Sequence, residues 1–325
     1  MTDRFDLTRR LPDGYFADAL STDVLKGLTG RPKSLPPKWF YDARGSELFE
    51  EITRLPEYYP TRAEHEILGE RGDAIAAATG ARTLIELGSG SSRKTRLLLD
   101  ALLRHGTLER YAALDVSADA LREAGEALIR DYPALKVTAC VTDLETDLGM
   151  PPAVRGPRLV AFLGGTLGNL DSAARPAFYA ALRPELAVGD ALLMGIDLVK
   201  DPAVLVPAYD DAQGVTAAFN KNVLLVLNRE LGAAFDPGAF EHRAVWNERE
   251  ERIEMRLRSR HAQTVALPEL GASAEFEADE EVLTEIAVKF RRASLTAELA
   301  RGGFGVSHWW TDAEGRFALL LAEPV

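Results

Sequence analysis

The sequence has a single cysteine, Cys140, among its 325 residues, so it cannot form an intrachain disulfide. One cysteine is typical of a protein in a reducing compartment, and we expect a cytoplasmic location. Cys140 lies in the apolar run 137–141, where a thiol is expected to be an inert part of the core. Uninterrupted apolar runs of about 18 residues are absent, and the opening residues, MTDRFDLTRRLPDG, are charged where a signal peptide is apolar. The sequence therefore predicts neither a membrane span nor a leader.

Basic residues are in the minority, since 38 Lys and Arg stand against 50 Asp and Glu, a formal net charge of −12. A protein that holds nucleic-acid phosphates usually has the opposite balance, and no run of Lys or Arg indicates a local basic groove. The five histidines are scattered without the H-x₃-H or H-E-x-x-H spacing of metal sites. We therefore expect a small-molecule ligand, no metal, no nucleic acid and no membrane. We also expect a monomer, because no segment resembles a dedicated assembly element.

The chain is 46% hydrophobic, which is enough apolar material for one large or two interlocked domains. Between residues 62 and 198, short apolar runs alternate with helical stretches, which predicts a parallel sheet covered on both faces. The expected strands are 83–87, 111–114, 136–141, 159–163 and 191–196. The expected helices include 93–103, 118–131 and 172–182.

The remaining segments have other patterns. Residues 1–61 are rich in proline and aromatics and predict irregular structure. In the segment 199–287, a long helix over 212–231 precedes strands, and the alternation within 252–258 predicts a half-buried antiparallel strand. The last residues predict a helix near 293–301 and a hairpin of 305–310 with 317–323. The fold class is thus α/β, with a Rossmann-like domain of residues 62–198 plus 288–325 and an α+β domain of residues 1–61 plus 199–287.

A glycine-rich turn, ELGSGSS, follows the first expected strand. Gly88 and Gly90 allow a sharp turn and a close approach of the backbone to a ligand, although such a turn can also be a tight strand–helix connection. The third glycine of the dinucleotide fingerprint is absent, because Arg93 stands in its place. This departure disfavours NAD and FAD and leaves a ligand without phosphate, such as S-adenosylmethionine.

Acidic residues end the next two expected strands. A carboxylate at Asp115 can accept hydrogen bonds from both ribose hydroxyls, although it could instead cap the helix that begins near Ser117. Asp143 could accept the exocyclic amine of an adenine. Glu86 and Lys94 flank the glycine loop, where they could position the methionyl end of the ligand or pair with each other on the surface.

Five longer stretches are distinctive: LPPKWFYDARGSELFEEITRLPEYYPTRAE, ELGSGSSRKTRLLLDAL, AFLGGTLGNL, YDDAQGVTAAFNKNVLLVLNRELGA and LTEIAVKF. They resemble the histidine Nα-methyltransferases of ergothioneine biosynthesis, and the resemblance covers essentially the full length. It implies a class I methyltransferase domain, a substrate-binding domain formed by residues 1–61 plus 199–287, and S-adenosyl-L-methionine as cofactor. The implied reaction is three successive methylations of the α-amino group of L-histidine, which give the betaine hercynine.

The resemblance also implies individual roles. The cofactor would be bound by Gly88, Lys94, Asp115 and Asp143, to which the loop pattern adds Glu86 and Gly90. Gly164 and Asn169, in the GGTLGN loop, would face the amino acid, and Asn169 and Tyr209 would hold its carboxylate. By pattern alone, Asn169 could be a turn residue and Tyr209 a packing residue.

The other end of the amino acid has its own implied residues. Tyr41 and Tyr58 would line the amino group, where they are the candidate catalytic residues, and their faces would attract the growing ammonium. Met255 would pack against the imidazole ring, and Glu285 would accept a hydrogen bond from it. The plainer interpretations are aromatic packing for the tyrosines, core filling for Met255 and a solvated strand-end acid for Glu285.

One position departs from the family. Ala287 stands where the family has a serine whose hydroxyl helps to grip imidazole. A lost neutral hydrogen bond costs roughly 0.5–1.5 kcal/mol, so affinity for histidine could fall about two- to tenfold, or the substrate could be another aromatic amino acid. Glu285 favours histidine, because a carboxylate buried against an apolar ring would have no partner. A third hypothesis is a non-catalytic protein that binds the cofactor.

Overall fold

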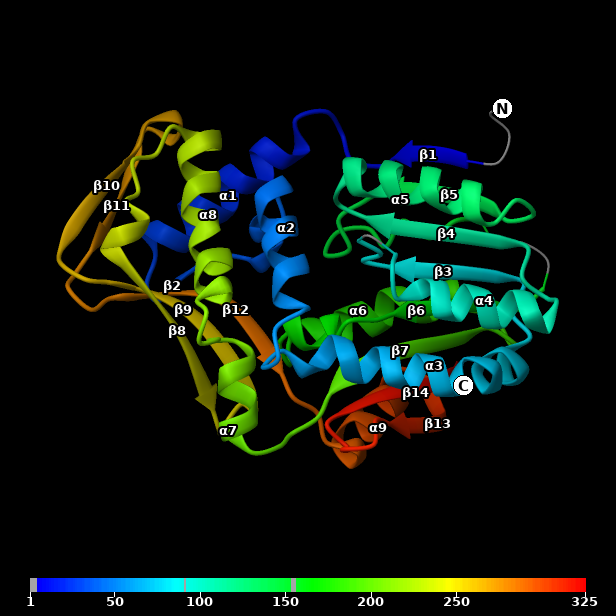
Figure 1. Cartoon of the computed structure of the whole chain (residues 1–325). Helices are drawn as coiled ribbons and strands as arrows, with labels where there is room; N and C mark the ends of the chain where they lie inside the picture. The colour runs from blue at the N-terminus through cyan, green and yellow to red at the C-terminus, as the bar shows by residue number, and fades with distance from the viewer. Residues whose placement is uncertain (1–4, 91, 153–155) are drawn as a thin grey trace. The chain divides into compact units, whose positions relative to one another are not determined.

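The computed structural model describes residues 5–90, 92–152 and 156–325 (Figure 1). The described residues separate into two compact units. Unit 1 contains the residues up to Pro12, Pro60–Val199 and Lys289–Val325, and unit 2 contains Asp13–Tyr59 and Lys200–Val288. This division differs from the expected one at the N-terminus, because the first residues belong to unit 1 and not to the expected domain of residues 1–61 plus 199–287.

Within the described residues, unit 1 is built on an eight-stranded sheet with the order β1-β5-β4-β3-β6-β7-β14-β13 (Figure 1). The neighbours from β1 to β7 run parallel, and β14 and β13 form an antiparallel hairpin beside β7. The strands are β1 (Phe5–Arg9), β3 (Thr83–Leu87), β4 (Arg110–Asp115), β5 (Lys136–Val141), β6 (Arg158–Phe162), β7 (Ala191–Asp197), β13 (Phe304–Thr311) and β14 (Phe317–Pro324).

Helices cover this sheet on both faces, because every residue of β3, β6 and β7 is buried although alternate side chains point to opposite faces. The covered parallel sheet and the terminal hairpin predicted from the sequence are therefore confirmed. The helices are α3 (Tyr59–Thr79), α4 (Thr95–His105), α5 (Ala118–Asp131), α6 (Ala174–Leu182) and α9 (Arg292–Arg301), with short 3₁₀ turns η2 (Thr166–Asn169) and η3 (Arg183–Glu185).

The N-terminal strand explains the difference in domain bounds. β1 pairs in parallel with β5, with Phe5 opposite Val137. The Phe5 ring packs so closely on Gly125 of α5 that a Cβ there would lie 2.2 Å from a ring carbon. A short, charged strand at a sheet edge carries little apolar signal, and its pairing partner lies more than a hundred residues away in the sequence.

The strand order places two loops side by side. The chain runs outward from β3 through β4 to β5, and then returns to β6 on the other side of β3. The loops after β3 and β6 therefore leave neighbouring strands at their carboxyl ends, at the topological switch point. Open α/β sheets bind ligands at this point.

Unit 2 combines helices with a four-stranded sheet of order β2-β12-β9-β8 and a two-stranded sheet of β10 and β11, as far as the described residues extend. Its strands are β2 (Lys33–Ser34), β8 (Phe240–Asn247), β9 (Arg252–Ser259), β10 (Gln263–Leu267), β11 (Ala272–Phe276) and β12 (Glu281–Val288). Its helices are α1 (Tyr15–Thr29), α2 (Ala43–Ile52), α7 (Pro202–Leu205) and α8 (Val215–Leu231), with 3₁₀ turns η1 (Pro37–Phe40), η4 (Val206–Ala208), η5 (Pro237–Ala239) and η6 (Pro268–Leu270).

The prediction that residues 1–61 are irregular is wrong for α1 and α2. In α1 the buried residues Leu20, Val24 and Leu28 recur every four positions and form one apolar face. The prolines that gave the segment its irregular pattern lie outside these two helices, where they do not interrupt their hydrogen bonds.

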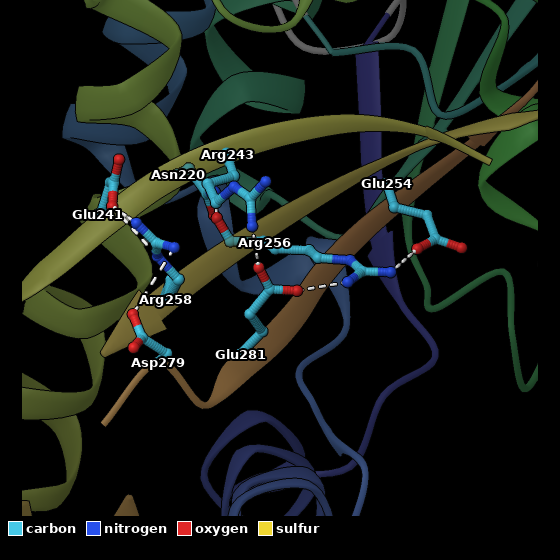
Figure 2. Close-up of polar contacts among 8 residues, drawn as sticks. All are labelled: Asn220, Glu241, Arg243, Glu254, Arg256, Arg258, Asp279 and Glu281. Atoms are coloured by element: carbon cyan, nitrogen blue, oxygen red, sulfur yellow. Dashed lines mark hydrogen bonds and ion pairs between the residues drawn. The ribbon is translucent and has the colours of Figure 1, made fainter. Parts of the chain in front are cut away.

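The predicted half-buried antiparallel strand is confirmed as β9, which pairs antiparallel with β8 and β12. Ile253, Met255 and Leu257 are buried on one face. The opposite face carries a ladder of ion pairs in which Arg256 bridges Glu254 and Glu281 (Figure 2). Further pairs join Arg243 to Glu281, and Arg258 to Glu241 and Asp279.

Glu254 shows how this ladder permits a buried charge. Burial alone would raise the pKa of Glu254, but hydrogen bonds from Arg256, Asn247 and Arg252 outweigh burial and hold its pKa below the ordinary value. Asn220 of α8 also donates to the Arg256 carbonyl, at 3.2 Å. The sheet is therefore held by charge on one face and by apolar packing on the other.

Candidate functional site

The glycine loop of unit 1 turns sharply after β3. Gly88 (φ +69) and Gly90 (φ +49) both lie in the left-handed region, which disfavours side chains. The Gly88 N–H donates to the Leu114 carbonyl of β4 at 2.8 Å, and a Cβ on either glycine would meet nothing within 4 Å. The glycines are thus required by the backbone conformation and not by close packing, and the space beside them is open.

Asp115 ties this loop to β4. One carboxylate oxygen accepts the Gly90 N–H at 2.9 Å, and the other accepts the Ser117 N–H at 3.0 Å. The cap of α5 is Ser117, whose hydroxyl accepts the Ala120 N–H, so capping does not explain Asp115. Burial raises the pKa of Asp115, although the two N–H donors favour its charged form. Each oxygen keeps a further lone pair for a ligand hydroxyl.

Glu86 lies behind the loop and is only 1% exposed. It accepts hydrogen bonds from the hydroxyls of Thr95 at 2.6 Å and Tyr111 at 2.5 Å. Burial raises its pKa to about 7, against the effect of those two donors. The alternative of a surface pair between Glu86 and Lys94 is therefore wrong, because Glu86 links the start of α4 to β4 inside the unit.

Lys94 has a different carboxylate partner, Glu64 of α3. The Lys94 Nζ donates to Glu64 Oε2 at 2.7 Å, and Glu64 Oε1 accepts the Gly164 N–H at 2.7 Å. Sequence reasoning missed Glu64. The signal was there, because Glu64 falls on the same buried helical face as Ile67 and Leu68, where the periodicity of α3 calls for an apolar residue.

The other predicted residues of unit 1 also lie at the carboxyl ends of the strands. Asp143 is buried just after β5, and one of its oxygens accepts the Glu145 N–H at 3.0 Å. Gly164 (φ +80) and Gly165 (φ +71) turn the chain after β6 into η2, which ends at Asn169. Asn169 is partly buried there.

Unit 2 holds its predicted tyrosines in one chain of aromatic rings. The Tyr41 ring contacts Phe49 and Phe219 at centroid distances of 5.7 and 5.5 Å, and the Tyr58 ring contacts Phe49 and Tyr209 at 6.2 Å each. These four pairs are edge-to-face, a preferred geometry of aromatic pairs, whereas the Phe49–Phe219 pair is tilted. Phe49 and Phe219 were not predicted, because single phenylalanines in amphipathic helices are indistinguishable from core residues.

Local hydrogen bonds fix the backbone on each side of Tyr41. Asp42 caps α2 by accepting the Gly45 N–H at 2.7 Å, and Asn222 of α8 donates to Asp42 at 2.8 Å. Asn222 also donates to the Phe40 carbonyl at 3.3 Å. A Cβ on Gly45 would lie 1.6 Å from that carbonyl oxygen, so only glycine fits. Tyr41 therefore sits between two anchored residues.

Tyr58 and Tyr59 differ although they are consecutive. Tyr59 is 3% exposed, and its hydroxyl accepts a hydrogen bond from Lys200 Nζ at 2.7 Å. Tyr58 is partly buried and presents its ring to Phe49 and Tyr209. Tyr59 is thus an aromatic packing residue, whereas Tyr58 belongs to the ring chain of Tyr41 and Tyr209.

A buried histidine fixes the backbone at Tyr209. His242 Nε2 lies 2.8 Å from the Tyr209 carbonyl, and its Nδ1 lies 2.8 Å from Asn220 Nδ2. Since the amide nitrogen donates to Nδ1, the proton of the neutral ring is on Nε2 and points to the carbonyl. Burial lowers the pKa of His242, which favours this neutral form.

Met255 and Glu285 stand opposite each other on β9 and β12. The register of this pair shifts between Leu283 and Glu285, and the hydroxyl of the intervening Thr284 donates to the Met255 carbonyl at 3.0 Å. Opposite residues of an antiparallel pair share a face, so Glu285 lies on the face of Met255. Ala287 pairs with Ile253 on the same face, two residues further on.

The predicted site residues thus fall into two sets. Glu86, Gly88, Gly90, Lys94, Asp115, Asp143, Gly164 and Asn169 belong to unit 1, whereas Tyr41, Tyr58, Tyr209, Met255 and Glu285 belong to unit 2. The described part of the chain contains no cluster of three or more histidine, cysteine or acidic side chains that could hold a metal ion. None of its described helices has the length and hydropathy to cross a membrane.

The family of S-adenosylmethionine-dependent, histidine-specific methyltransferases matches residues 20–324. The chain belongs to this family. It is 57% identical over 306 residues to the histidine N-alpha-methyltransferase of Mycolicibacterium smegmatis, with 94% of this chain and 95% of that protein covered. It is 53% identical over 304 residues to the histidine N-alpha-methyltransferase of Mycobacterium tuberculosis, with 94% of each covered. An L-tryptophan methyltransferase of Psilocybe serbica is 30% identical over 293 residues, with 81% of this chain and 80% of that protein covered.

The predicted fold class, enzyme class and cofactor are confirmed by this membership. The loop residues of this methyltransferase fit S-adenosylmethionine, because the carboxylate of Asp115 keeps acceptor capacity beside two open glycines. The hydroxyl of Ser89 in the same loop is buried and has no hydrogen-bond partner among the described residues. A buried hydroxyl without a hydrogen bond destabilises a protein by about 1–3 kcal/mol. A polar ligand at this loop that bonds to the hydroxyl would remove this destabilisation.

Proposed function

We propose that the protein transfers methyl groups from S-adenosyl-L-methionine to the α-amino nitrogen of L-histidine, three times in succession, to give the trimethylated betaine hercynine. The observation that carries the choice of histidine is the position of Glu285 opposite Met255. A carboxylate beside an apolar thioether can accept an imidazole N–H while the thioether packs on the ring. The two relatives above 50% identity bear the same activity in their names.

In this proposal the cofactor is held by the residues at the carboxyl ends of β3, β4 and β5. Asp115 takes the ribose hydroxyls with its remaining lone pairs, and Asp143 takes the adenine amine. Lys94 and the open glycines take the methionyl end. The cofactor supplies the methyl group as a sulfonium when it is bound.

The amino acid is oriented by its carboxylate and its ring. Asn169 and Tyr209 hold the carboxylate, and His242 keeps the Tyr209 backbone in place through its hydrogen bond to the carbonyl. Displacement at the methyl group requires the nitrogen lone pair to be in line and about 3 Å away. The two ends of the substrate must therefore be fixed together, and Glu285 supplies the second anchor.

The ring chain of unit 2 suits a product that becomes a quaternary ammonium. Tyr41 and Tyr58 present aromatic faces at the amino end, and cation–π attraction to such faces favours the charged product as methyl groups accumulate. Tyr41 is 40% exposed, and in this proposal water reaches the amino end beside its ring and carries away the amine proton.

Mass spectrometry of the purified protein with S-adenosylmethionine and a substrate panel tests this proposal. We expect mono-, di- and trimethylated histidine, with fragmentation that places the methyl groups on the α-nitrogen. Nα-acetylhistidine, which lacks the free amine, and histamine, which lacks the carboxylate, serve as matched controls and should remain unmodified. Preferential methylation of tryptophan or phenylalanine would overturn the choice of histidine.

A second candidate substrate is another aromatic amino acid, and Ala287 is the observation that favours it. The alanine is 7% exposed and lies in an apolar cluster with Ile253 and Tyr59. An apolar wall at this point accommodates an indole or phenyl ring as well as an imidazole. The same panel, with all amino acids in one competing mixture, ranks these substrates by their kcat/KM values.

A further inference from the structure

Glu64 is a fully buried carboxylate that joins two loops of unit 1. It is 0% exposed, and each of its oxygens has one partner at 2.7 Å, Lys94 Nζ for Oε2 and the Gly164 N–H for Oε1. Lys94 follows β3 and Gly164 follows β6, so the bridge spans the two neighbouring strands at the switch point.

The surrounding glycines leave room for this bridge. A Cβ on Gly195 of β7 would lie 1.9 Å from Glu64 Oε1, and a Cβ on Gly164 would lie 2.7 Å from Lys94 Nζ. Gly195 has no positive φ, so its backbone conformation does not call for glycine. The small residue at 195 is therefore explained by the carboxylate of Glu64 and not by a turn.

A buried carboxylate with two partners fixes both of them. If Lys94 moved away, Glu64 would be a buried charge without its counter-ion, and if Gly164 moved away, a buried N–H would lose its acceptor. The positions of the two loops are therefore not independent. A ligand that orders one loop lowers the cost of ordering the other, which is the physical basis of positive coupling between two sites.

We propose that Glu64 is a positioning residue that couples binding of the cofactor, at the loop of Lys94, to binding of the amino acid, at the loop of Gly164. This inference rests on the proposed function, which assigns those two loops to the two ligands. Glu64 touches neither ligand in this scheme. It transmits the presence of one to the other through Lys94 Nζ and the Gly164 N–H.

Two variants break the two arms of the bridge separately. Glu64→Gln keeps an oxygen for the Gly164 N–H but turns an amide donor toward the Lys94 ammonium. Gly195→Ala keeps the charge of Glu64 but pushes Oε1 away from the Gly164 N–H. Lys94→Met, at a side chain that is 29% exposed, removes the first arm from its other end and reports on it if Glu64→Gln does not fold.

The measurement is the dissociation constant of S-adenosylhomocysteine, obtained by calorimetry without and with saturating histidine. The ratio of the two constants is the coupling. In wild-type protein we expect tighter binding in the presence of histidine. Each variant should lower the ratio about fivefold or more, at the lower end of typical allosteric couplings.

Asp190→Asn is the matched control. Asp190 is also a buried carboxylate of unit 1, paired with Arg158 at 2.6 Å, but it lies at the amino ends of β6 and β7. This variant should lose thermal stability and keep the coupling of the wild type. A merely structural role for Glu64 would give the same result as the control.

The outcomes separate the two levels of the proposal. If histidine is methylated and the ratio stays at its wild-type value in both Glu64→Gln and Gly195→Ala, the inference on Glu64 is wrong and the proposed function stands. A wild-type ratio of one would also overturn it. If wild-type protein binds S-adenosylhomocysteine but neither binds nor methylates histidine, the proposed function falls, and this inference falls with it.

Discussion

The loops of unit 1 and the ring chain of unit 2 hold their residues by different forces. In unit 1, side-chain carboxylates bind backbone N–H groups: Asp115 holds Gly90, and Glu64 holds Gly164. In unit 2, hydrogen bonds anchor the backbone beside Tyr41 and at Tyr209, but the rings of Tyr41, Tyr58 and Tyr209 are held by ring contacts at 5.5–6.2 Å. Under the proposed function, the hydrogen-bonded loop of Gly90 suits a cofactor that is the same in every turnover. Under the same proposal, the aromatic faces of unit 2 suit a substrate that gains methyl groups.

This contrast predicts where changes of specificity arise. A loop held by short hydrogen bonds to charged groups loses them in steps of about 1.5–3 kcal/mol. A face lined by Met255, Ala287 and tyrosine rings can be reshaped by single methyl or hydroxyl groups at a smaller cost. Ala287, where the family resemblance implies a serine, lies on that face.

The largest effect is expected at Glu86, and it depends on pH. Burial raises the pKa of the Glu86 carboxyl in the folded protein to about 7, from an ordinary value of 4.5. This difference in pKa corresponds to a contribution of roughly 3 kcal/mol to the free energy of unfolding. Between these values the folded state keeps a proton that the unfolded state has released, so this contribution to stability is lost as pH rises from about 4.5 to 7. Glu86→Gln has no such proton. Denaturant unfolding between pH 5 and 8 measures the free energy of unfolding of both proteins. As pH rises, the stability of Glu86→Gln should increase relative to that of the wild type. Parallel profiles would mean that Glu86 has the same pKa in the folded and unfolded states.

Asp115→Ala tests the hydrogen-bonded side of the comparison. It removes the acceptor of the Gly90 N–H and the proposed acceptor of the ribose, so S-adenosylhomocysteine should bind about 1.5–3 kcal/mol more weakly. Calorimetry measures this loss. Asp115→Asn, which keeps one oxygen for the Gly90 N–H, should lose less. Equal affinity in wild type and Asp115→Ala would remove this residue from the site.

The sequence predicted unit 1 better than unit 2, for a physical reason. In unit 1 the glycine loop, Asp115 and Asp143 each follow an apolar run, and the strand order brings such positions together at one edge. A local motif can therefore predict which of these residues lie at the same edge of the sheet. Glu64 was not predicted because its partners, Lys94 and Gly164, are 30 and 100 residues away in the sequence. Its charge on the apolar face of a helix was nevertheless a visible signal.

In unit 2 no local sequence motif indicates which residues lie together. Met255 and Glu285 become neighbours only through the pairing of β9 with β12, and the register shift at Thr284 decides which side chains share a face. Alternation in a single strand does not reveal a bulge in its pairing. The predicted roles of Tyr41, Tyr58 and Tyr209 came from family resemblance, and the ring chain that joins them through Phe49 was not foreseen.

Glu285→Ala probes the specificity of unit 2. Histidine should lose about 2 kcal/mol in kcat/KM, because a ring N–H loses a charged acceptor. Tryptophan and phenylalanine need no such acceptor and should be spared or improved. The matched control is Glu281→Ala on the same strand, which breaks ion pairs with Arg243 and Arg256 and should leave substrate preference unchanged. Equal losses for all three amino acids would assign Glu285 to folding.

Tyr209→Phe tests whether the ring chain contributes more than packing. Loss of one hydroxyl on the substrate carboxylate should weaken histidine binding by about 1.5 kcal/mol, roughly tenfold, with S-adenosylhomocysteine affinity nearly constant. Asn169→Ala should behave alike. Tyr59→Phe is the control, because the Tyr59 hydroxyl is bound to Lys200. If both ligands weaken together in Tyr209→Phe, the tyrosine supports the fold and does not select the substrate.

The smallest effect is expected at Ala287, where the family resemblance implies a serine. A serine there would carry its hydroxyl on the face of Glu285 and Ile253, within an apolar cluster. In the free protein that hydroxyl would be placed among the apolar side chains of this cluster, so Ala287→Ser should slightly lower thermal stability. With histidine bound it can reach the ring, and affinity should improve by up to about 1.5 kcal/mol. A well-held water that already fills this gap would reduce the gain to nearly zero.

Ala287→Cys distinguishes the effect of hydrogen bonding by a hydroxyl from the effect of added side-chain volume at position 287. A thiol is at least as large as a hydroxyl but a much weaker hydrogen-bond partner, so it should give no gain in affinity. Calorimetry with histidine and with phenylalanine, both in the presence of S-adenosylhomocysteine, measures the three proteins on the same scale. A gain confined to histidine in the serine variant would show that this face reads the imidazole. Equal shifts for histidine and phenylalanine would mean that position 287 acts through shape alone, and the preference for imidazole would then have to come from Glu285.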